Sequence, residues 1–159
     1  MVNYNCLRLG CMDPRVQEKE MEYLKSQGIY PCDWISIPGA SLCIARAGWK
    51  SPYSWWAWVE KKVIFHWIEN AIKLHRINTI ILIHHSRCGA YTLRYGEKFL
   101  TPAEEKRVQI YDMLLAAEKI KKKWLRLRLS FVLLWEELID EEGKDIKFQD
   151  AAQDYFSQE

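Results

Sequence analysis

A short apolar run near the middle of the chain limits the possible folds most strongly. Residues Thr79 to His84 read TIILIH and are nearly all β-branched or aliphatic. A strand with one face in water alternates apolar and polar residues, whereas this run is continuous. It therefore predicts a central strand of a parallel sheet, covered by helices on both faces.

The rest of the chain fits an alternation of strands and helices. We expect strands at 4–10 and 33–37 and within 127–135, and helices at 14–27, from Ser51–Pro52 to 74, and at 101–123, with an irregular segment between the second strand and Pro52. The apolar arc of the helix that ends near Leu74 is wide enough to predict burial on two sides, against the sheet and against another subunit. The predicted fold is therefore α/β, with a mostly parallel central β-sheet flanked by helices.

Length and charge restrict the class of protein. A chain of 159 residues fits a single domain, 1–159, and a net charge of +2 gives no general attraction to nucleic acid or to a membrane surface. The basic stretch Lys121 to Lys123 is explained by the negative end of a helix dipole. No signal-peptide pattern and no stretch of membrane-spanning length occurs, so we expect a cytoplasmic protein.

Two of the predicted strands end in residues that can bind a metal ion. Cys11, Asp13 and Arg15 follow the first strand, and His85 and Cys88 form an H-x-x-C pair after the central strand. The carboxyl ends of parallel strands share one edge of the sheet, where ligands bind. Zinc prefers Cys sulfur and His nitrogen, and three protein ligands with an open fourth position are typical of a catalytic site. The sequence predicts one zinc ion per chain.

The remaining cysteines and the histidine beside the H-x-x-C pair receive structural interpretations. Cys6, Cys32 and Cys43 are expected to be buried thiols, because the five cysteines form no dense disulfide framework. His84 directly precedes His85 and points to the opposite face of its strand, so a packing or hydrogen-bonding role is predicted for it.

The pairing of C-x-D-x-R with H-x-x-C-G, in this order and at strand ends, resembles the β-class carbonic anhydrases. The resemblance implies that Cys11, His85 and Cys88 bind zinc and that Asp13 and Arg15 form a carboxylate–guanidinium dyad. It implies the reversible hydration of carbon dioxide to bicarbonate by a zinc-bound hydroxide, which Asp13 orients while Arg15 holds Asp13. It also implies a closed state in which Asp13 takes the fourth zinc position.

The chain departs from the pattern of that family in several places. The Arg-Asn-Ala-Gly stretch that follows the second strand in the family is replaced by Ile37-Pro38-Gly39-Ala40-Ser41. From the early position of Cys11 we also expect the family's N-terminal helical arm to be missing. A hydrolase of carbon disulfide or carbonyl sulfide, which the same scaffold also resembles, and a non-catalytic zinc-binding relative therefore stay open. A phosphate- or nucleotide-binding domain is disfavoured, because no glycine-rich loop follows any strand.

The aromatic content predicts a partner subunit. Eight tryptophans are present, and Trp55, Trp56 and Trp58 lie together at the start of the longest predicted apolar helix. This is more aromatic surface than a small core easily buries. We expect a homodimer or a larger homo-oligomer that acts on a small-molecule substrate.

Overall fold

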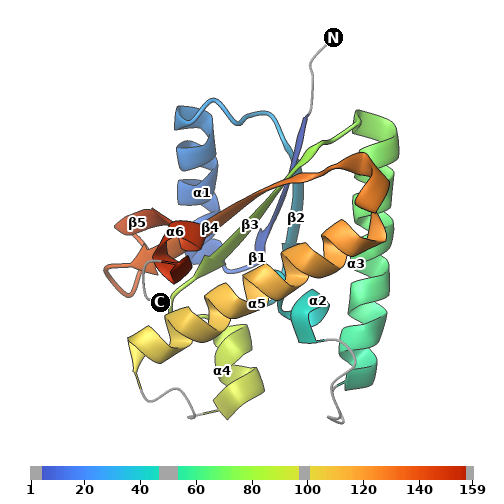
Figure 1. Cartoon of the computed structure of the whole chain (residues 1–159). Helices are drawn as coiled ribbons and strands as arrows, with labels where there is room; N and C mark the ends of the chain where they lie inside the picture. Colours follow the sequence, from blue (N-terminus) through green and yellow to red (C-terminus); the bar gives the residue numbers. More distant parts are fainter. Residues whose placement is uncertain (1–4, 47–53, 97–100, 157–159) are drawn as a thin grey trace.

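The protein folds into a five-stranded sheet with helices on both faces (Figure 1). The structure is a computed structural model and describes residues 5–46, 54–96 and 101–156. The strands and helices follow in the order β1 (Cys6–Cys11), α1 (Pro14–Ser26), β2 (Asp33–Ile37), α2 (Leu42–Arg46), α3 (Ser54–His75), β3 (Thr79–His85), α4 (Gly89–Tyr95), α5 (Pro102–Lys123), the 3₁₀ turn η2 (Leu125–Leu127), β4 (Ser130–Leu138), β5 (Ile146–Asp150) and α6 (Ala151–Phe156).

The strand order in the sheet is β2-β1-β3-β4-β5. The first four strands in this order are parallel, and β5 is antiparallel to β4. The prediction of a central parallel strand is confirmed, because β3 lies between β1 and β4 and every residue from Ile80 to His85 is buried. No helix among the described residues has the length and apolar character needed to cross a membrane.

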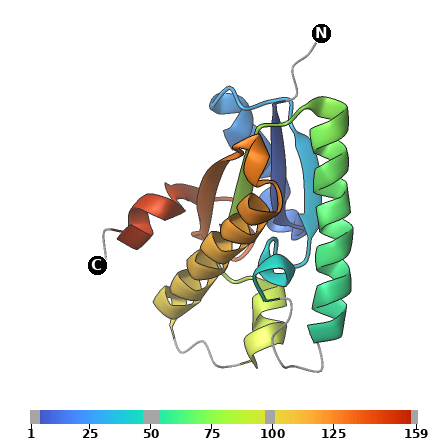
Figure 2. The same cartoon turned by 45° about the vertical axis from the view of Figure 1, so that its right-hand side comes forward.

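The two faces of the sheet carry different helices (Figure 2). The larger core lies on one face, where Ile44 of α2, Ile68 of α3 and Met113 of α5 pack over the sheet. On the other face, Leu24 of α1 packs against Ile81 and its neighbours. The crossovers through these helices leave the carboxyl ends of β1 and β3 side by side at one edge of the sheet.

Several elements differ from the predictions. The segment expected to be irregular contains α2, which has five residues and is too short to show a helical period. Strand β4 runs on to Leu138, and β5 and α6 follow it, although no strand or helix was expected there. β5 is an edge strand whose residues are exposed or half-buried, so it carries no strong apolar signal. The proposed start of the long helix at Ser51 and Pro52 lies outside the described residues.

Helix α3 packs against the sheet with one of the two apolar sides that the sequence predicts. Its inner face carries Ile64, Ile68 and Ala71, which are buried. Trp56 and Trp67, which belong to the predicted apolar arc, are 61% and 45% exposed in the single chain. In this chain the helix therefore packs on one side, and an apolar stripe on its other side faces solvent.

A buried arginine that the sequence did not mark braces the carboxyl end of β1. Arg8 is fully buried and forms an ion pair with Glu20 of α1. Its guanidinium also donates to Ser36 Oγ at 2.7 Å and to the Cys11 carbonyl at 3.3 Å. A Cβ atom at Gly10 would collide with this guanidinium, so a larger residue there would displace Arg8 from its partners. The arginine ties β1 to β2 and α1 next to Cys11.

Candidate metal centre

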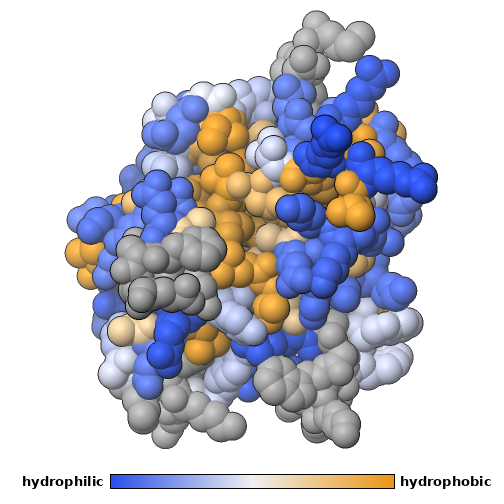
Figure 3. All heavy atoms as spheres, viewed as in Figure 1, coloured by the Kyte–Doolittle hydropathy of each residue, from blue (hydrophilic) through white to orange (hydrophobic). Residues whose placement is uncertain are grey.

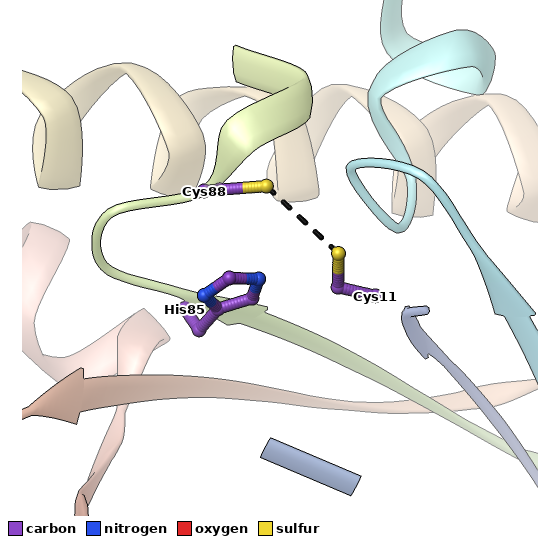
Figure 4. A group of neighbouring side chains, drawn as sticks. All are labelled: Cys11, His85 and Cys88. Atoms are coloured by element: carbon purple, nitrogen blue, oxygen red, sulfur yellow. Dashed lines mark hydrogen bonds between the residues drawn. The ribbon is translucent and has the colours of Figure 1, made fainter. Parts of the chain in front are cut away.

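Three side chains from two neighbouring strand ends converge on one point (Figure 4). Cys11 ends β1, His85 ends β3, and Cys88 is the N-cap residue of α4. Their ligand atoms lie within 4.8 Å of one another, and the two sulfurs are 3.9 Å apart. Each side chain is almost completely buried. Among the described residues, this is the only group of three or more His, Cys, Asp or Glu side chains that is arranged to hold a metal ion.

The geometry fits a zinc ion. Two thiolates in a tetrahedral site, each about 2.3 Å from the metal, are separated by roughly 3.8 Å, close to the separation found here. His85 Nδ1 donates to the Ser86 carbonyl at 2.9 Å, so the proton lies on Nδ1 and Nε2 keeps a free lone pair. His85 Nε2 is buried and has no hydrogen-bond partner in the described part of the chain. A metal ion would satisfy this nitrogen.

The two thiols share one polar environment. The hydrogen bond with Cys88, and secondarily the imidazole of His85, hold the pKa of Cys11 below its ordinary value. The same hydrogen bond, together with burial, raises the pKa of Cys88. Without a cation, two thiolates at this distance repel each other, and a zinc ion would remove that repulsion. The donor set is therefore suited to a soft, positively charged ligand.

Asp13 and Arg15 stand beside the cluster in direct contact with each other. Asp13 is the N-cap residue of α1 and accepts from the Arg15 backbone amide at 3.0 Å. The Arg15 guanidinium binds both carboxylate oxygens, with Nε 3.0 Å from Oδ1 and Nη2 2.6 Å from Oδ2. These contacts hold the pKa of the Asp13 carboxyl below its ordinary value. Asp13 Oδ2 lies 4.0 Å from His85 Nε2, so an ionised carboxylate faces the candidate metal position.

Arg15 also joins the two halves of the site. Its Nη2 donates to the Arg87 carbonyl at 3.1 Å, within the H-x-x-C loop. Behind it, a Cβ atom at Gly143 would lie 2.6 Å from the Arg15 backbone oxygen, so the segment between β4 and β5 closes tightly against the first turn of α1. The dyad is therefore held by contacts from three parts of the chain.

The predicted structural role of His84 is confirmed. Its ring is buried, and Nε2 lies 2.7 Å from Ser41 Oγ while Nδ1 lies 3.1 Å from Gln109 Oε1. Burial lowers the pKa of His84 to about 3 and keeps the ring neutral. Of the other thiols, Cys6 and Cys43 are buried as expected, whereas Cys32 is half-buried.

The segment that replaces Arg-Asn-Ala-Gly lies beside the cluster. A cavity of about 350 Å³ opens between α2, α3 and α4, and Pro38, Leu42 and Ala90 form part of its wall. Leu42 and Ala90 also pack around Cys11 and Cys88. The cavity is therefore next to the candidate metal position, and its wall on that side is apolar.

Sequence reasoning missed two polar residues that contact the H-x-x-C loop. Glu105 and Gln109 project from α5, and both form hydrogen bonds with the loop backbone. The capping box Thr101-Pro102-Ala103-Glu104 correctly located the start of this helix, with Thr101 Oγ1 accepting from the Glu104 amide at 3.2 Å. A cap shows where a helix begins, but it does not show which loop the first turn contacts.

The fold and the buried Cys-His-Cys cluster define an α/β protein with a candidate zinc centre at the carboxyl ends of two parallel strands. A family described as "Putative carbonic anhydrase" matches residues 1–137. The chain belongs to this carbonic anhydrase family. A search of curated protein sequences gave no match.

Solved structures of β-carbonic anhydrases share the fold. The enzyme from Coccomyxa has a TM-score of 0.53 at 12% identity, over 98% of this chain and 83% of its own. Isoform I from Trichomonas vaginalis has a TM-score of 0.53 at 10% identity, over 92% and 82% of the two chains. CafD from Aspergillus fumigatus has a TM-score of 0.52 at 13% identity, over 86% and 85%. These similarities confirm the predicted β-carbonic-anhydrase-like fold.

Proposed function

We propose that this protein is a zinc-dependent carbonic anhydrase that catalyses the reversible hydration of carbon dioxide to bicarbonate. Membership of the carbonic anhydrase family supports the proposal at the level of reaction class. The observation that carries it further is the convergence of Cys11 Sγ, His85 Nε2 and Cys88 Sγ within 4.8 Å. An ionised carboxylate, which a purely structural zinc site does not need, stands 4.0 Å from the ring nitrogen.

Each site residue has a distinct task in this proposal. Cys11, His85 and Cys88 hold the ion, and zinc bound there supplies Lewis-acid activation of water. Asp13 accepts a hydrogen bond from the attacking water and directs its lone pair toward carbon dioxide. Arg15 keeps Asp13 ionised and fixes its orientation through a two-pronged contact. We also propose that residues 1–159 form one domain, because the larger core joins residues from Leu7 to Ala151.

A second candidate reaction is the hydrolysis of carbon disulfide or carbonyl sulfide. The apolar wall formed by Pro38, Leu42 and Ala90 is compatible with it, because these sulfur compounds, like carbon dioxide, are linear and uncharged. The same three zinc ligands and the same dyad would serve this reaction. The two candidates differ only in the substrate that the cavity admits.

A stopped-flow assay with a pH indicator tests the proposal. The zinc-loaded protein at pH 8.5 should hydrate carbon dioxide well above the rate of buffer alone, because zinc-activated water is available there. A parallel assay measures sulfide release from carbon disulfide and carbonyl sulfide. Hydration at the buffer rate with full zinc would reject the carbonic anhydrase proposal, and sulfide release in the same sample would establish the alternative.

We further propose a homodimer or larger homo-oligomer, built on the exposed stripe of α3. The stripe consists of Trp56, Val63, Trp67 and Leu74, whose exposed fractions lie between 40% and 75%. The stripe adjoins β2, the edge strand that pairs with β1 on one side of the sheet. Trp67 and Leu74 line a groove together with Trp34 of β2. Apolar residues also gather over β4 and α5 on another face (Figure 3). Apolar surface of this extent is typical of a protein interface.

Light scattering at micromolar concentration should give at least twice the 18.9 kDa mass of one chain. Trp67→Glu should reduce this mass to that of a monomer, because the substitution places a charge in the proposed interface. Lys121→Glu, which introduces the same carboxylate on an exposed turn of α5, should leave the mass unchanged. A monomeric wild-type protein would refute the proposed oligomer.

A further inference from the structure

The loop that carries two of the proposed zinc ligands is held from outside by one carboxylate. Glu105 Oε2 accepts from the Arg87 amide and Oε1 accepts from the Cys88 amide, each at 3.0 Å. Glu105 lies in the first turn of α5, which is distant from Cys88 in sequence and packs against it in space. Both adjacent backbone amides of the loop are therefore fixed by the same side chain.

Gln109 adds a contact with His85, the residue at the start of the loop. It lies one helical turn after Glu105, and its Nε2 donates to Glu105 Oε1 at 2.9 Å and to the His85 carbonyl at 3.0 Å. The backbone on both sides of the loop, at His85 and at Cys88, is thus tied to α5. Neither Glu105 nor Gln109 belongs to the Cys-His-Cys cluster.

The loop needs such restraint because one of its residues has an unfavourable backbone conformation. Arg87 has a φ of +57°, in the left-handed region that residues with a side chain rarely occupy. Its amide is held by Glu105 and its carbonyl by Arg15 Nη2. Without these two contacts, the loop would relax toward a more common conformation, and Cys88 Sγ and His85 Nε2 would separate.

We propose that Glu105, supported by Gln109, is a positioning residue that presets the H-x-x-C loop for zinc. This inference rests on the proposed zinc site and adds the part of the chain that orients two of its ligands. Residues that orient metal ligands through hydrogen bonds, without binding the metal themselves, typically contribute a factor of about 10 to 100 to metal affinity. The carboxylate acts through backbone amides, so it touches neither the ion nor the substrate.

The test compares three variants on the same turn of α5. Glu105→Gln keeps the size of the side chain but replaces one acceptor oxygen by a donor, so one loop amide loses its partner. Glu105→Asp keeps the charge and withdraws the carboxylate by one methylene. Glu104→Gln is the matched control, because Glu104 is one residue away, is half-buried and contacts Thr101 rather than the loop.

Two measurements are made on each protein. Competition with a chromophoric zinc chelator should show zinc affinity about 10 to 100-fold weaker in Glu105→Gln, a smaller loss in Glu105→Asp, and wild-type affinity in Glu104→Gln. In the metal-free proteins, NMR should show faster hydrogen exchange at the Arg87 and Cys88 amides in Glu105→Gln than in the wild type. Exchange in Glu105→Asp should not exceed that in Glu105→Gln, and Glu104→Gln should exchange at the wild-type rate. A residue that only stabilised the fold would lower the melting temperature without weakening the affinity of the folded protein.

The outcomes separate this inference from the proposed function. If wild type binds zinc and Glu105→Gln binds it equally well, the positioning role is refuted. If the wild-type protein binds no zinc, the proposed function fails. In that case the exchange data decide the inference: unchanged exchange at the Arg87 and Cys88 amides in Glu105→Gln would show that Glu105 does not restrain the loop. If Glu105→Gln does not fold, Glu105→Asp decides, and wild-type affinity in that variant overturns the proposal.

Discussion

Cys88→Ser is expected to lose nearly all of the bound zinc, from about one ion per chain in the wild type. A serine hydroxyl is not deprotonated near neutral pH and is a much poorer zinc ligand than a thiolate. Affinity should fall on the order of 10²-fold or more, since much of the binding free energy depends on each ligand. Metal analysis after gel filtration measures the content.

Cys32→Ser is the matched control for this prediction. Cys32 carries the same thiol and is half-buried. It directly precedes β2, so it lies at the amino ends of the strands, whereas the site lies at their carboxyl ends. Its zinc content should equal that of the wild type, and circular dichroism should show that both variants are folded. Full zinc content in a folded Cys88→Ser variant would exclude Cys88 as a ligand and remove the main support for the site.

Asp13→Ala and Arg15→Ala are each expected to lower carbon dioxide hydration by about 10²-fold or more while zinc stays bound. Asp13 contributes orientation rather than an obligatory ligand, and Arg15 contributes by holding both carboxylate oxygens. Arg15→Ala should have a further effect on the Arg87 carbonyl, which loses its donor. Stopped-flow rates and zinc content, measured on the same samples, separate the two effects.

Glu18→Ala provides the comparison for the dyad variants. Glu18 lies on the same helix, is exposed and lies outside the cluster. Its rate should match that of the wild type. Near-wild-type hydration in Asp13→Ala would show that the carboxylate does not orient the nucleophile, and the role proposed for the dyad would be wrong.

Parts of the fold that depend on local pattern were predictable from the sequence. The continuous apolar run of β3 marked a buried parallel strand, and the capping box at Thr101 marked the start of α5. The short helix α2 and the edge strand β5 were not predictable, because neither is long enough or apolar enough to show a period. Their positions are decided by packing against α5 and by pairing with β4.

The candidate site divides in the same way. The residue types Cys11, His85 and Cys88, and their places after two strands, are properties of the sequence, because the chemistry of a ligand and the direction of a parallel strand are local. That the three ligand atoms meet within 4.8 Å is a property of the tertiary structure.

The supports of the site were decided by tertiary structure alone. Arg8 reads in the sequence as an interruption of an apolar strand, and Glu105 reads as one more acidic residue in a helix. Only the folded chain places Arg8 against the Cys11 carbonyl and Glu105 against two loop amides. A hydrogen bond depends on the relative position of two groups in space, and for groups far apart in the chain no local pattern records that position. The sequence by itself therefore determined the metal-binding chemistry, and the packing of α1 and α5 decided how it is held.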